Sequence, residues 1–183
     1  MHGTSEGIQT DDPAQRGSGQ SVYTRGYLIY VVALLFSINF VNYFDRNLMV
    51  VLLEPIRLEF GLSDSQAGLL NGAAFSVVYT LMALPIARLA DTRSRRKLLA
   101  AAVGFWSVMT GLCGIAGSFF VLLAARLGVG VGESGVLPML HSLVSDTVSP
   151  RRRALVLTLL AVANTGGMII GFGVGGYVAE HFG

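Results

Sequence analysis

Four charged side chains lie inside stretches of sequence that are otherwise strongly apolar: Asp45, Arg46, Arg126 and Glu133. A carboxyl group can take up and release a proton, and a guanidinium group binds carboxylates and phosphates through its planar fork of N–H donors. Arg126 and Glu133 are seven residues apart, about two turns of an α-helix, so a helix places them on one face. The four charges sum to zero, which permits them to pair with one another.

Two interpretations of these charges follow. Ionisable groups at bilayer depth are costly, and they mark substrate or proton sites by default. On that interpretation Asp45 and Glu133 are candidate proton-coupling groups, while Arg46 and Arg126 are candidates for binding an anionic substrate. On the other interpretation the four side chains form an ion-pair cluster that only fixes helix packing. The sequence favours the first, and it leaves open which arginine pairs with which carboxylate.

The elements that carry these charges are expected to be membrane-spanning helices. The chain is 183 residues long, 52% hydrophobic and only 13% charged, whereas soluble domains average about 25% charged residues. This composition excludes an ordinary soluble enzyme, a disordered chain and a collagen-like chain. Apolar stretches cover residues 27–53, 66–90, 98–116, 118–144 and 154–179. Each approaches or exceeds the ~20 residues that cross a hydrocarbon core, and helices satisfy their own backbone hydrogen bonds there.

The distribution of basic residues predicts how the helices are oriented. Ten of the 13 lysines and arginines lie in the N-terminal segment and in the second-to-third and fourth-to-fifth connections. Because cytoplasmic loops carry an excess of such residues, the N-terminus is expected in the cytoplasm. We expect an integral multi-pass protein of a bacterial inner membrane, with a disordered cytoplasmic tail over residues 1–26 and a transmembrane bundle over residues 27–183.

Helix geometry also predicts how deep the charges lie. At about 1.5 Å per residue, Asp45 lies ~12 Å inside the outer end of the first span, and Arg126 lies ~11 Å inside the same side on the fourth. The first and fourth spans can therefore meet with Asp45, Arg46 and Arg126 at similar height. Glu133 is expected about two turns closer to the cytoplasm.

The connection between the second and third spans, residues 87–97, holds one acidic residue, Asp91, among five basic ones. Asp91 is expected to pair with Arg95 or to cap a helix N-terminus, and so to bias one conformation from the cytoplasmic side. The segment resembles the loop signature G-x-L-A-D-R-x-G-R-R of the major facilitator superfamily. The residues that match this signature are Leu89, Ala90, Asp91, Arg95 and Arg96. Ala87 and Ser94 replace its glycines, and Thr92 stands where the family often has arginine.

Within that superfamily the chain is most similar to spinster-type lipid transporters. The residues that carry this likeness are Asn42-Tyr43-Phe44-Asp45-Arg46, Phe105-Trp106-Ser107 and the glycine-rich run from Arg126 to Glu133. The resemblance implies a twelve-helix fold of two six-helix halves, of which this chain supplies the first five helices. It also implies alternating access, linked to protons, for a lysophospholipid or sphingoid phosphate. Asn42 and Tyr43 join the two arginines as candidate substrate contacts, and Asp91, Arg95 and Arg96 form a candidate gating loop.

Other functions receive less support from the sequence. A transporter of a small organic anion or drug on the same fold is one alternative. A truncated membrane protein that only assembles with partners is another. Residues 130–135 fit the dinucleotide pattern G-x-G-x-x-G, but they lie inside an apolar span without the required strand. No residue set has the spacing of a metal or hydrolase site, so we expect no enzyme and no cofactor, and the net charge of +2 is too small for nucleic-acid binding.

The fifth span carries a glycine stripe at Gly167, Gly171 and Gly175, each four residues from the next. Such G-x-x-x-G spacing lets another helix approach closely in a membrane. The stripe resembles an antiporter motif of the superfamily, but Phe172 stands where that motif has proline. The segment therefore predicts a helix-packing surface and gives no support for antiport.

Overall fold

The computed structural model describes residues 24–182, which are almost entirely helical and include no β-strand. In chain order the elements are α1 (Arg25–Glu59), α2 (Asp64–Gly68), the π-helix η2 (Leu69–Ala73), α3 (Ala74–Thr92), α4 (Arg95–Gly114), α5 (Phe119–Ser134), α6 (Val136–Thr147) and α7 (Pro150–Phe182). The expected all-α fold is thereby confirmed.

Five helical units among the described residues are long and apolar enough to cross a membrane. They cover Arg25–Glu59, Asp64–Thr92, Arg95–Gly114, Phe119–Thr147 and Pro150–His181, and they coincide with the five predicted stretches. Large apolar side chains point outward from these helices; Leu84, Ile115 and Phe120 are 69%, 79% and 78% exposed. Such a surface suits a lipid environment and confirms an integral multi-pass protein.

The first helix extends beyond its predicted end at residue 53, to Glu59. The guanidinium of Arg57 contacts the Glu54 carboxylate at 2.6 Å and the Asp64 carboxylate at 2.9 Å. These pairs partly neutralise the charges, so the helix continues past its apolar stretch. Gly61, with a φ of 61°, then reverses the chain, and the Ser63 side chain accepts a hydrogen bond from the backbone of Gln66 to begin α2.

Residues 1–23 of the predicted tail, which was expected over residues 1–26, lie outside the described residues. Its last two residues, Arg25 and Gly26, belong to α1, so the predicted boundary was wrong by two residues. The helix begins this early because the carbonyl oxygen of Thr24 accepts a hydrogen bond from the backbone N–H of Leu28 at 3.1 Å.

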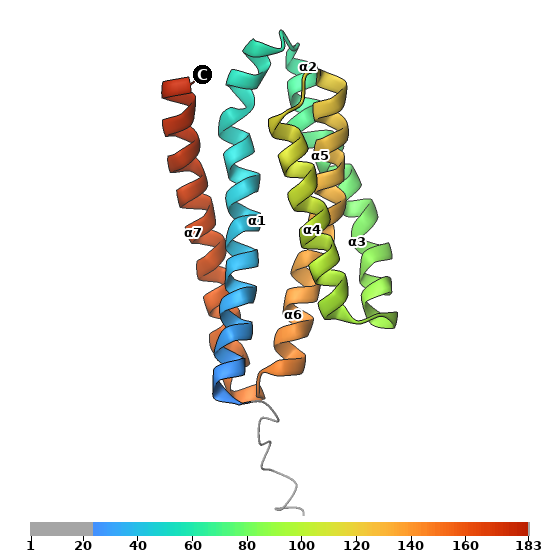
Figure 1. Cartoon of the computed structure of the whole chain (residues 1–183), viewed down its shortest axis with the longest axis vertical. Coiled ribbons are helices and arrows are strands. Elements are labelled where there is room, and N and C mark those ends of the chain that lie inside the picture. The colour runs from blue at the N-terminus through green and yellow to red at the C-terminus, as the bar shows by residue number, and fades with distance from the viewer. Residues whose placement is uncertain (1–23, 183) are drawn as a thin grey trace, which may run out of the picture.

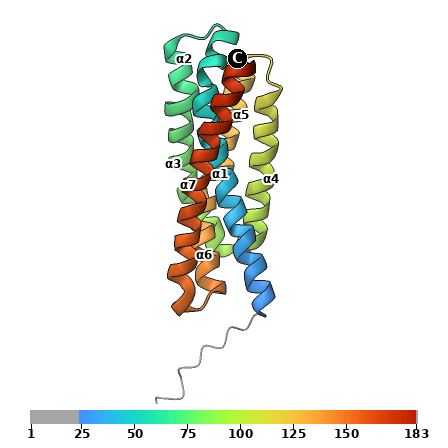
Figure 2. The ribbon, with the colours of Figure 1, turned by 90° about the vertical axis from the view of Figure 1, so that its left-hand side faces the viewer.

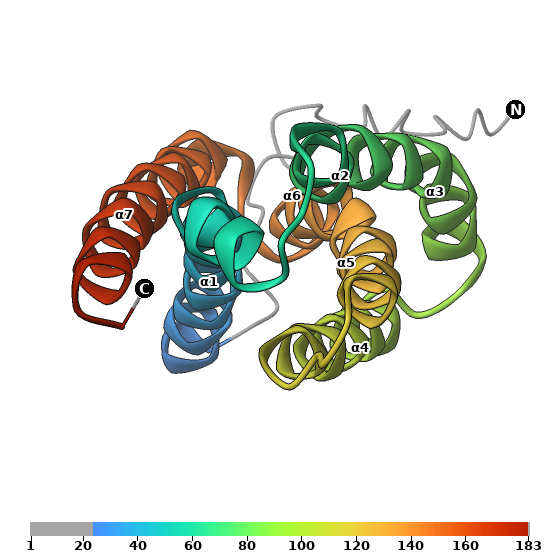
Figure 3. The ribbon, with the colours of Figure 1, turned by 90° about the horizontal axis from the view of Figure 1, so that it is seen from above.

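The helices form two packed groups. Helices α1, α4 and α7 begin at the same end of the bundle (Figure 1); we call it the basic end, because Arg25, Arg95 and Arg151 lie there. Helices α1 and α7 pack closely and run in the same direction (Figure 2). Seen from above, α3 and α4 flank α5, and α6 lies between this group and the α1/α7 pair (Figure 3).

The fourth span is interrupted between α5 and α6. Pro138 lacks the N–H that would bond to the carbonyl oxygen of Ser134 in a continuous α-helix. Helix α5 ends at Ser134, and α6 begins at Val136 after a single intervening residue, Gly135. The Ser134 hydroxyl donates a hydrogen bond to the carbonyl oxygen of Val131 at 2.8 Å. The interruption follows directly after Glu133, so this carboxylate lies in the last turn of α5.

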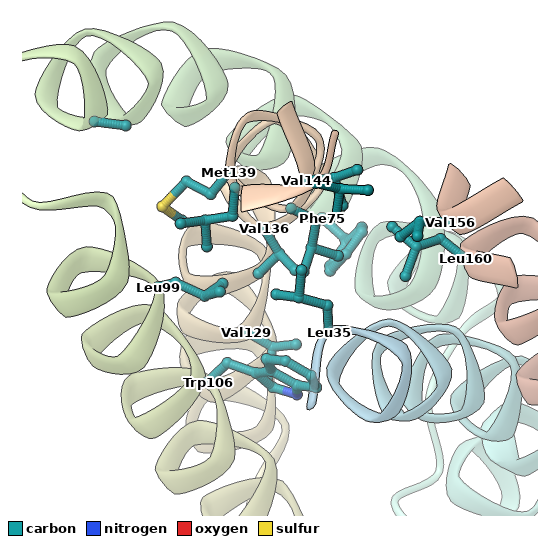
Figure 4. Close-up of a cluster of buried hydrophobic side chains, with 14 residues drawn as sticks. Leu35, Phe75, Leu99, Trp106, Val129, Val136, Met139, Val144, Val156 and Leu160 are labelled. Atoms are coloured by element: carbon teal, nitrogen blue, oxygen red, sulfur yellow. The ribbon is translucent and has the colours of Figure 1, made fainter. Parts of the chain in front are cut away.

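A hydrophobic core joins the two groups. Figure 4 shows side chains from α1, α3, α4, α5, α6 and α7 meeting around Phe75 and Val129. Val129 and Leu140 are fully buried, and Trp106 is 3% exposed. In a membrane such side chains stabilise the bundle through close van der Waals packing between helices, because lipid chains are as apolar as the core. The core therefore holds α5 and α6 at the centre and fixes the height of the charges on α5.

Candidate functional site

The closest contact between the intramembrane charges joins α1 to α5. Nη2 of Arg46 lies 2.7 Å from Oε2 of Glu133, and the Glu133 side chain is completely buried. Arg46 itself is partly exposed. The pairing that the sequence left open is therefore Arg46 with Glu133.

Arg126 lies on α5 and is buried, at 3% exposure. No acidic side chain in the described part of the chain forms an ion pair with it; its guanidinium carbon lies 5.1 Å from the centre of the Phe75 ring. Arg126 is therefore a buried cation that contacts an aromatic ring.

Asp45, the neighbour of Arg46, binds hydroxyl and indole groups of α4. Its Oδ2 accepts hydrogen bonds from the Trp106 indole N–H at 3.3 Å and from the Thr110 hydroxyl at 3.1 Å. The four charges thus do not form one cluster of mutual pairs, although they lie in the same region of the bundle. The hydrogen-bonding role of Thr110 was not predicted, and no motif in the sequence indicates it.

Aromatic rings surround the guanidinium of Arg46. Its central carbon lies 5.9 Å from the ring centre of Tyr43, 5.2 Å from that of Phe75 and 4.9 Å from that of Tyr79. Neither Phe75 nor Tyr79 was predicted as a site residue. Their spacing was the available signal: they are the only aromatic residues of the second span, and being four apart they share a helix face.

Several polar atoms around the Arg46–Glu133 pair have no hydrogen-bond partner within residues 24–182. They are Nδ2 of Asn42, Nε of Arg46, Nε of Arg126 and Oε1 of Glu133. Buried polar atoms are normally satisfied, because an unsatisfied one costs about 1–3 kcal/mol. Three of these atoms are donors. The region therefore offers N–H groups to an anion, and one carboxylate oxygen to a donor.

The glycines of α5 bring neighbouring helices close to this region. A Cβ on Gly132 would lie 2.7 Å from Cβ of Trp106, and one on Gly130 would lie 3.3 Å from the Phe75 ring. Both positions therefore leave space for an aromatic side chain. Through them α5 supports the two rings that contact Asp45 and the arginines.

Comparison with known proteins identifies the family of this bundle. The model of the Major Facilitator Superfamily matches residues 35–183. The chain belongs to the major facilitator superfamily. Its fold is the expected one, and the membership covers all five spans.

Relatives within the superfamily include transporters of more than one kind. An MFS-type efflux pump of Mycolicibacterium smegmatis is 35% identical over 163 residues, which cover 89% of this chain and 36% of the pump. Protein spinster homolog 1 of Homo sapiens is 32% identical over 152 residues, which cover 82% of this chain and 29% of that protein.

A solved structure agrees with the spinster likeness. The chain resembles the crystal structure of a bacterial homolog to the human lysosomal transporter spinster, in an inward-facing and occupied conformation, with a TM-score of 0.81 and 37% identity. The match covers 86% of this chain and 34% of that one. The chain thus spans about a third of the length of the proteins it matches, and it is confirmed as spinster-like.

The loop that resembles the superfamily signature forms a charge cluster at the basic end. Arg95 contacts the Asp146 carboxylate of α6 at 2.6 Å and the Asp91 carboxylate at 3.8 Å. Asp91 thus takes the predicted pairing with Arg95, while the first residue before α4 is Ser94. Arg96 instead lies 5.9 Å from the ring centre of Tyr27. Asp146 was missed, because it is distant in sequence and only folding brings it to the loop.

The glycine stripe of this superfamily member faces α1. A Cβ on Gly171 would lie 2.8 Å from the carbonyl oxygen of Phe44, and one on Gly175 would lie 2.9 Å from Cβ of Val51. A Cβ on Gly167 would lie closer still to the carbonyl oxygen of Phe40. Nearby, the Asn39 amide donates to the carbonyl oxygen of Leu160 at 2.9 Å and to the side-chain oxygen of Asn164. Together these contacts hold α1 and α7 as one unit.

No metal cluster of histidine, cysteine or acidic side chains is found within residues 24–182. His141 is exposed on α6, away from the Arg46–Glu133 pair. The side chains gathered at this site are arginines, carboxylates, amides and aromatic rings.

Proposed function

We propose that the full-length protein is a secondary active transporter that moves an anionic amphiphile across the membrane by alternating access, linked to protons. The buried ion pair between Arg46 and Glu133 is the observation that carries this proposal. A buried ion pair adds little net stability over apolar packing, because both charges must leave water. An ion pair whose carboxylate is completely buried in a transporter fold is consistent with a working role.

Exchange of partners is the central step of the mechanism. When Glu133 takes up a proton, its attraction for Arg46 falls and the guanidinium becomes available to another anion. The Arg46 fork can then hold a phosphate or carboxylate in two hydrogen bonds. Asn42 and Arg126 supply further N–H donors that lack partners. Release of the proton restores the original pair and expels the anion.

The amphiphile is inferred from the mixed character of the site. Tyr43 and Phe75 place aromatic surface beside two cations, which suits a molecule with a charged head and an apolar chain. The similarity to spinster proteins supports a lysophospholipid or a sphingoid phosphate. The substrate shifts the conformational equilibrium only if it binds the inward- and outward-open states with different affinity.

Movement requires elements that shift relative to one another. Helices α1 and α7 form one closely packed pair, and α3, α4 and α5 form another group. We place the basic end in the cytoplasm of a bacterial cell, following the positive-inside rule. A second half of the transporter, beyond the five spans of this chain, would complete the cavity and supply its opposite wall.

A transporter of a small organic anion or drug is the second candidate, favoured by the 35% identity to a mycobacterial efflux pump. The same Arg46 fork would hold the anion, and no apolar chain would be needed.

The two candidates are separated by uptake into vesicles containing the full-length protein. We expect transport of lysophosphatidic acid and little transport of glycerol 3-phosphate, which has the same head group without the acyl chain. Equal transport of both would favour the small-anion alternative. Absence of transport for every anion tested would contradict the proposed activity. Arg46→Gln should abolish the transport of lysophosphatidic acid, and Arg152→Gln, which removes the same charge from an exposed position at the basic end, is the control and should leave it unchanged.

A further inference from the structure

Three aromatic rings enclose one side of the Arg46 guanidinium, from two different helices. Tyr43 belongs to α1, whereas Phe75 and Tyr79 belong to α3. The distances from the central guanidinium carbon, 5.9, 5.2 and 4.9 Å, fall within the ~6 Å range of attraction between a cation and a ring face. We call Tyr43, Phe75 and Tyr79 the aromatic cage.

We propose that the aromatic cage holds the Arg46 guanidinium in position independently of Glu133, so that an anion meets a cation that is already placed. This inference rests on the proposed function in one respect only, the binding of an anion at Arg46. Within it, Phe75 and Tyr79 are positioning residues that act through Arg46.

The aromatic cage can hold Arg46 in place when Glu133 is protonated and the ion pair is lost. Once Glu133 is neutral, Arg46 loses its carboxylate partner while remaining partly buried. A ring face attracts the cation through its quadrupole and accepts few of its N–H bonds. The Tyr79 side chain also interacts with the guanidinium as a hydrogen-bond partner, and the remaining in-plane donors, which include the unpartnered Nε, are available to a phosphate or carboxylate. Guanidinium is also weakly hydrated, which makes it well suited to an aromatic surrounding.

A π-helical turn directly precedes the two aromatic residues of the second span and changes the side of the helix on which they lie. Five residues separate Leu70 from Phe75, and in an uninterrupted α-helix they would differ by about 140° around the axis. The π-helix η2 contains Leu70 and ends just before α3, which carries Phe75, and the N–H of Ala74 bonds to the carbonyl oxygen of Leu69, five residues earlier. Such a wide turn brings residues five apart onto one side. Both Leu70 and Phe75 are accordingly buried.

The packing of Phe75 fixes the cage further. Its ring stacks on Tyr79 with 5.9 Å between ring centres and 26° between planes. Behind it, Gly130 on α5 leaves room for the ring at 3.3 Å from the position of a Cβ. Arg126 approaches the same ring at 5.1 Å. One aromatic side chain thus contacts both intramembrane arginines.

Fluorination of Phe75 tests the cage with almost no change in shape. We would replace Phe75 by trifluorophenylalanine in the full-length protein, because fluorine withdraws the negative charge of the ring face. The binding of lysophosphatidic acid is expected to weaken about fivefold. The melting temperature without ligand should fall by about 2 °C. The same replacement at Phe120, which is 78% exposed on α5, provides the matched control and should leave both values unchanged.

The variant Arg46→Gln then tests whether fluorination of Phe75 acts through the Arg46 cation or through ordinary packing of the ring. In this variant fluorination of Phe75 should lower the melting temperature by less than it does beside Arg46, because one of the two cations has gone. In Glu133→Gln, where Arg46 depends on the rings alone, the fluorination effect on binding should increase. An equal loss of melting temperature with and without Arg46 would overturn the cage.

The same data distinguish failure of the cage from failure of the proposed function. Dependence of the fluorination effect on Arg46, measured without any ligand, supports the cage even if the unsubstituted protein binds no anion. That combination would overturn the proposed substrate class. Normal anion binding that is unaffected by fluorination would overturn the cage and leave the proposed function intact.

Discussion

Asp45 and Arg46 are consecutive residues of α1, yet they bind different helices. The Asp45 carboxylate accepts hydrogen bonds from Trp106 and Thr110 of α4, whereas Arg46 pairs with Glu133 of α5. Successive residues of an α-helix point about 100° apart, so one short segment of α1 reaches two neighbours. These polar contacts join α1 to α4 and α5 at the height of the charged residues.

Arg46→Lys keeps the charge of the site but removes its planar fork. We expect the affinity of the full-length protein for lysophosphatidic acid to fall about tenfold, because an ammonium group cannot make the bidentate contact. Equilibrium binding to purified protein measures this change. Arg152→Lys, at an exposed position of α7, should have no effect. Undiminished affinity in Arg46→Lys would show that Arg46 does not hold the anion through its fork.

Removal of the donors to Asp45 should expose its carboxylate. Thr110→Val is nearly isosteric and deletes one hydrogen bond, worth about 1 kcal/mol, so the free carboxylate should become about fivefold more populated. Labelling of Asp45 by a carbodiimide reports this accessibility. Ser107→Ala is the control on the same helix, because the Ser107 hydroxyl bonds only to the carbonyl oxygen of Val103, at 2.8 Å, among the described contacts. Equal labelling in both variants would contradict a holding role for Thr110.

The two faces of α7 should respond differently to a single added methyl group. Gly171→Ala places a Cβ 2.8 Å from the Phe44 carbonyl oxygen, a backbone atom that cannot move aside. We expect destabilisation of about 1–3 kcal/mol. Gly173→Ala meets nothing within 4 Å in the described structure and should be neutral. Thermal unfolding of the full-length protein compares the two. Equal melting temperatures would mean that α1 and α7 separate more readily than their packing indicates.

The charge cluster at the basic end should affect transport more than stability. Arg95 and Asp146 are both partly exposed, so Arg95→Gln is expected to cost less than about 1 kcal/mol of folding free energy. If the loop biases one conformation, the transport rate should still change several-fold. The exchanged pair Arg95→Asp with Asp146→Arg should restore part of the original rate. A rate unaffected by any of these changes would exclude a gating role for the loop.

The sequence was sufficient to predict the membrane-spanning helices but not the side-chain contacts between them. Apolar stretches and basic loops predicted five helices and their common end, because a membrane imposes length and hydrogen-bonding constraints on every segment. The end of α1 was misplaced, since charge pairing at Arg57 extends the helix beyond its apolar stretch. Such pairing depends on side chains that meet only in three dimensions.

The candidate site was likewise predictable in part. Asp45, Arg46, Arg126 and Glu133 were identified by their charge in an apolar setting, and the helical spacing placed Arg126 and Glu133 on one face. The pairing of Arg46 with Glu133 was not predictable, because it depends on how α1 and α5 rotate about their axes. The contact of Phe75 with Arg46 was not predictable for a similar reason. The π-helix before Phe75 alters the register of α3, and no residue pattern in the sequence predicts that turn.

The proposed transport mechanism depends most directly on whether Glu133 couples anion transport to protons. The decisive measurement is uptake of lysophosphatidic acid by vesicles containing the full-length protein, with and without an imposed proton gradient. We predict that the gradient stimulates the unsubstituted protein at least tenfold, and that Glu133→Gln still binds the anion but transports it equally with or without the gradient. A Glu133→Gln protein that retains full proton-driven uptake would contradict the account.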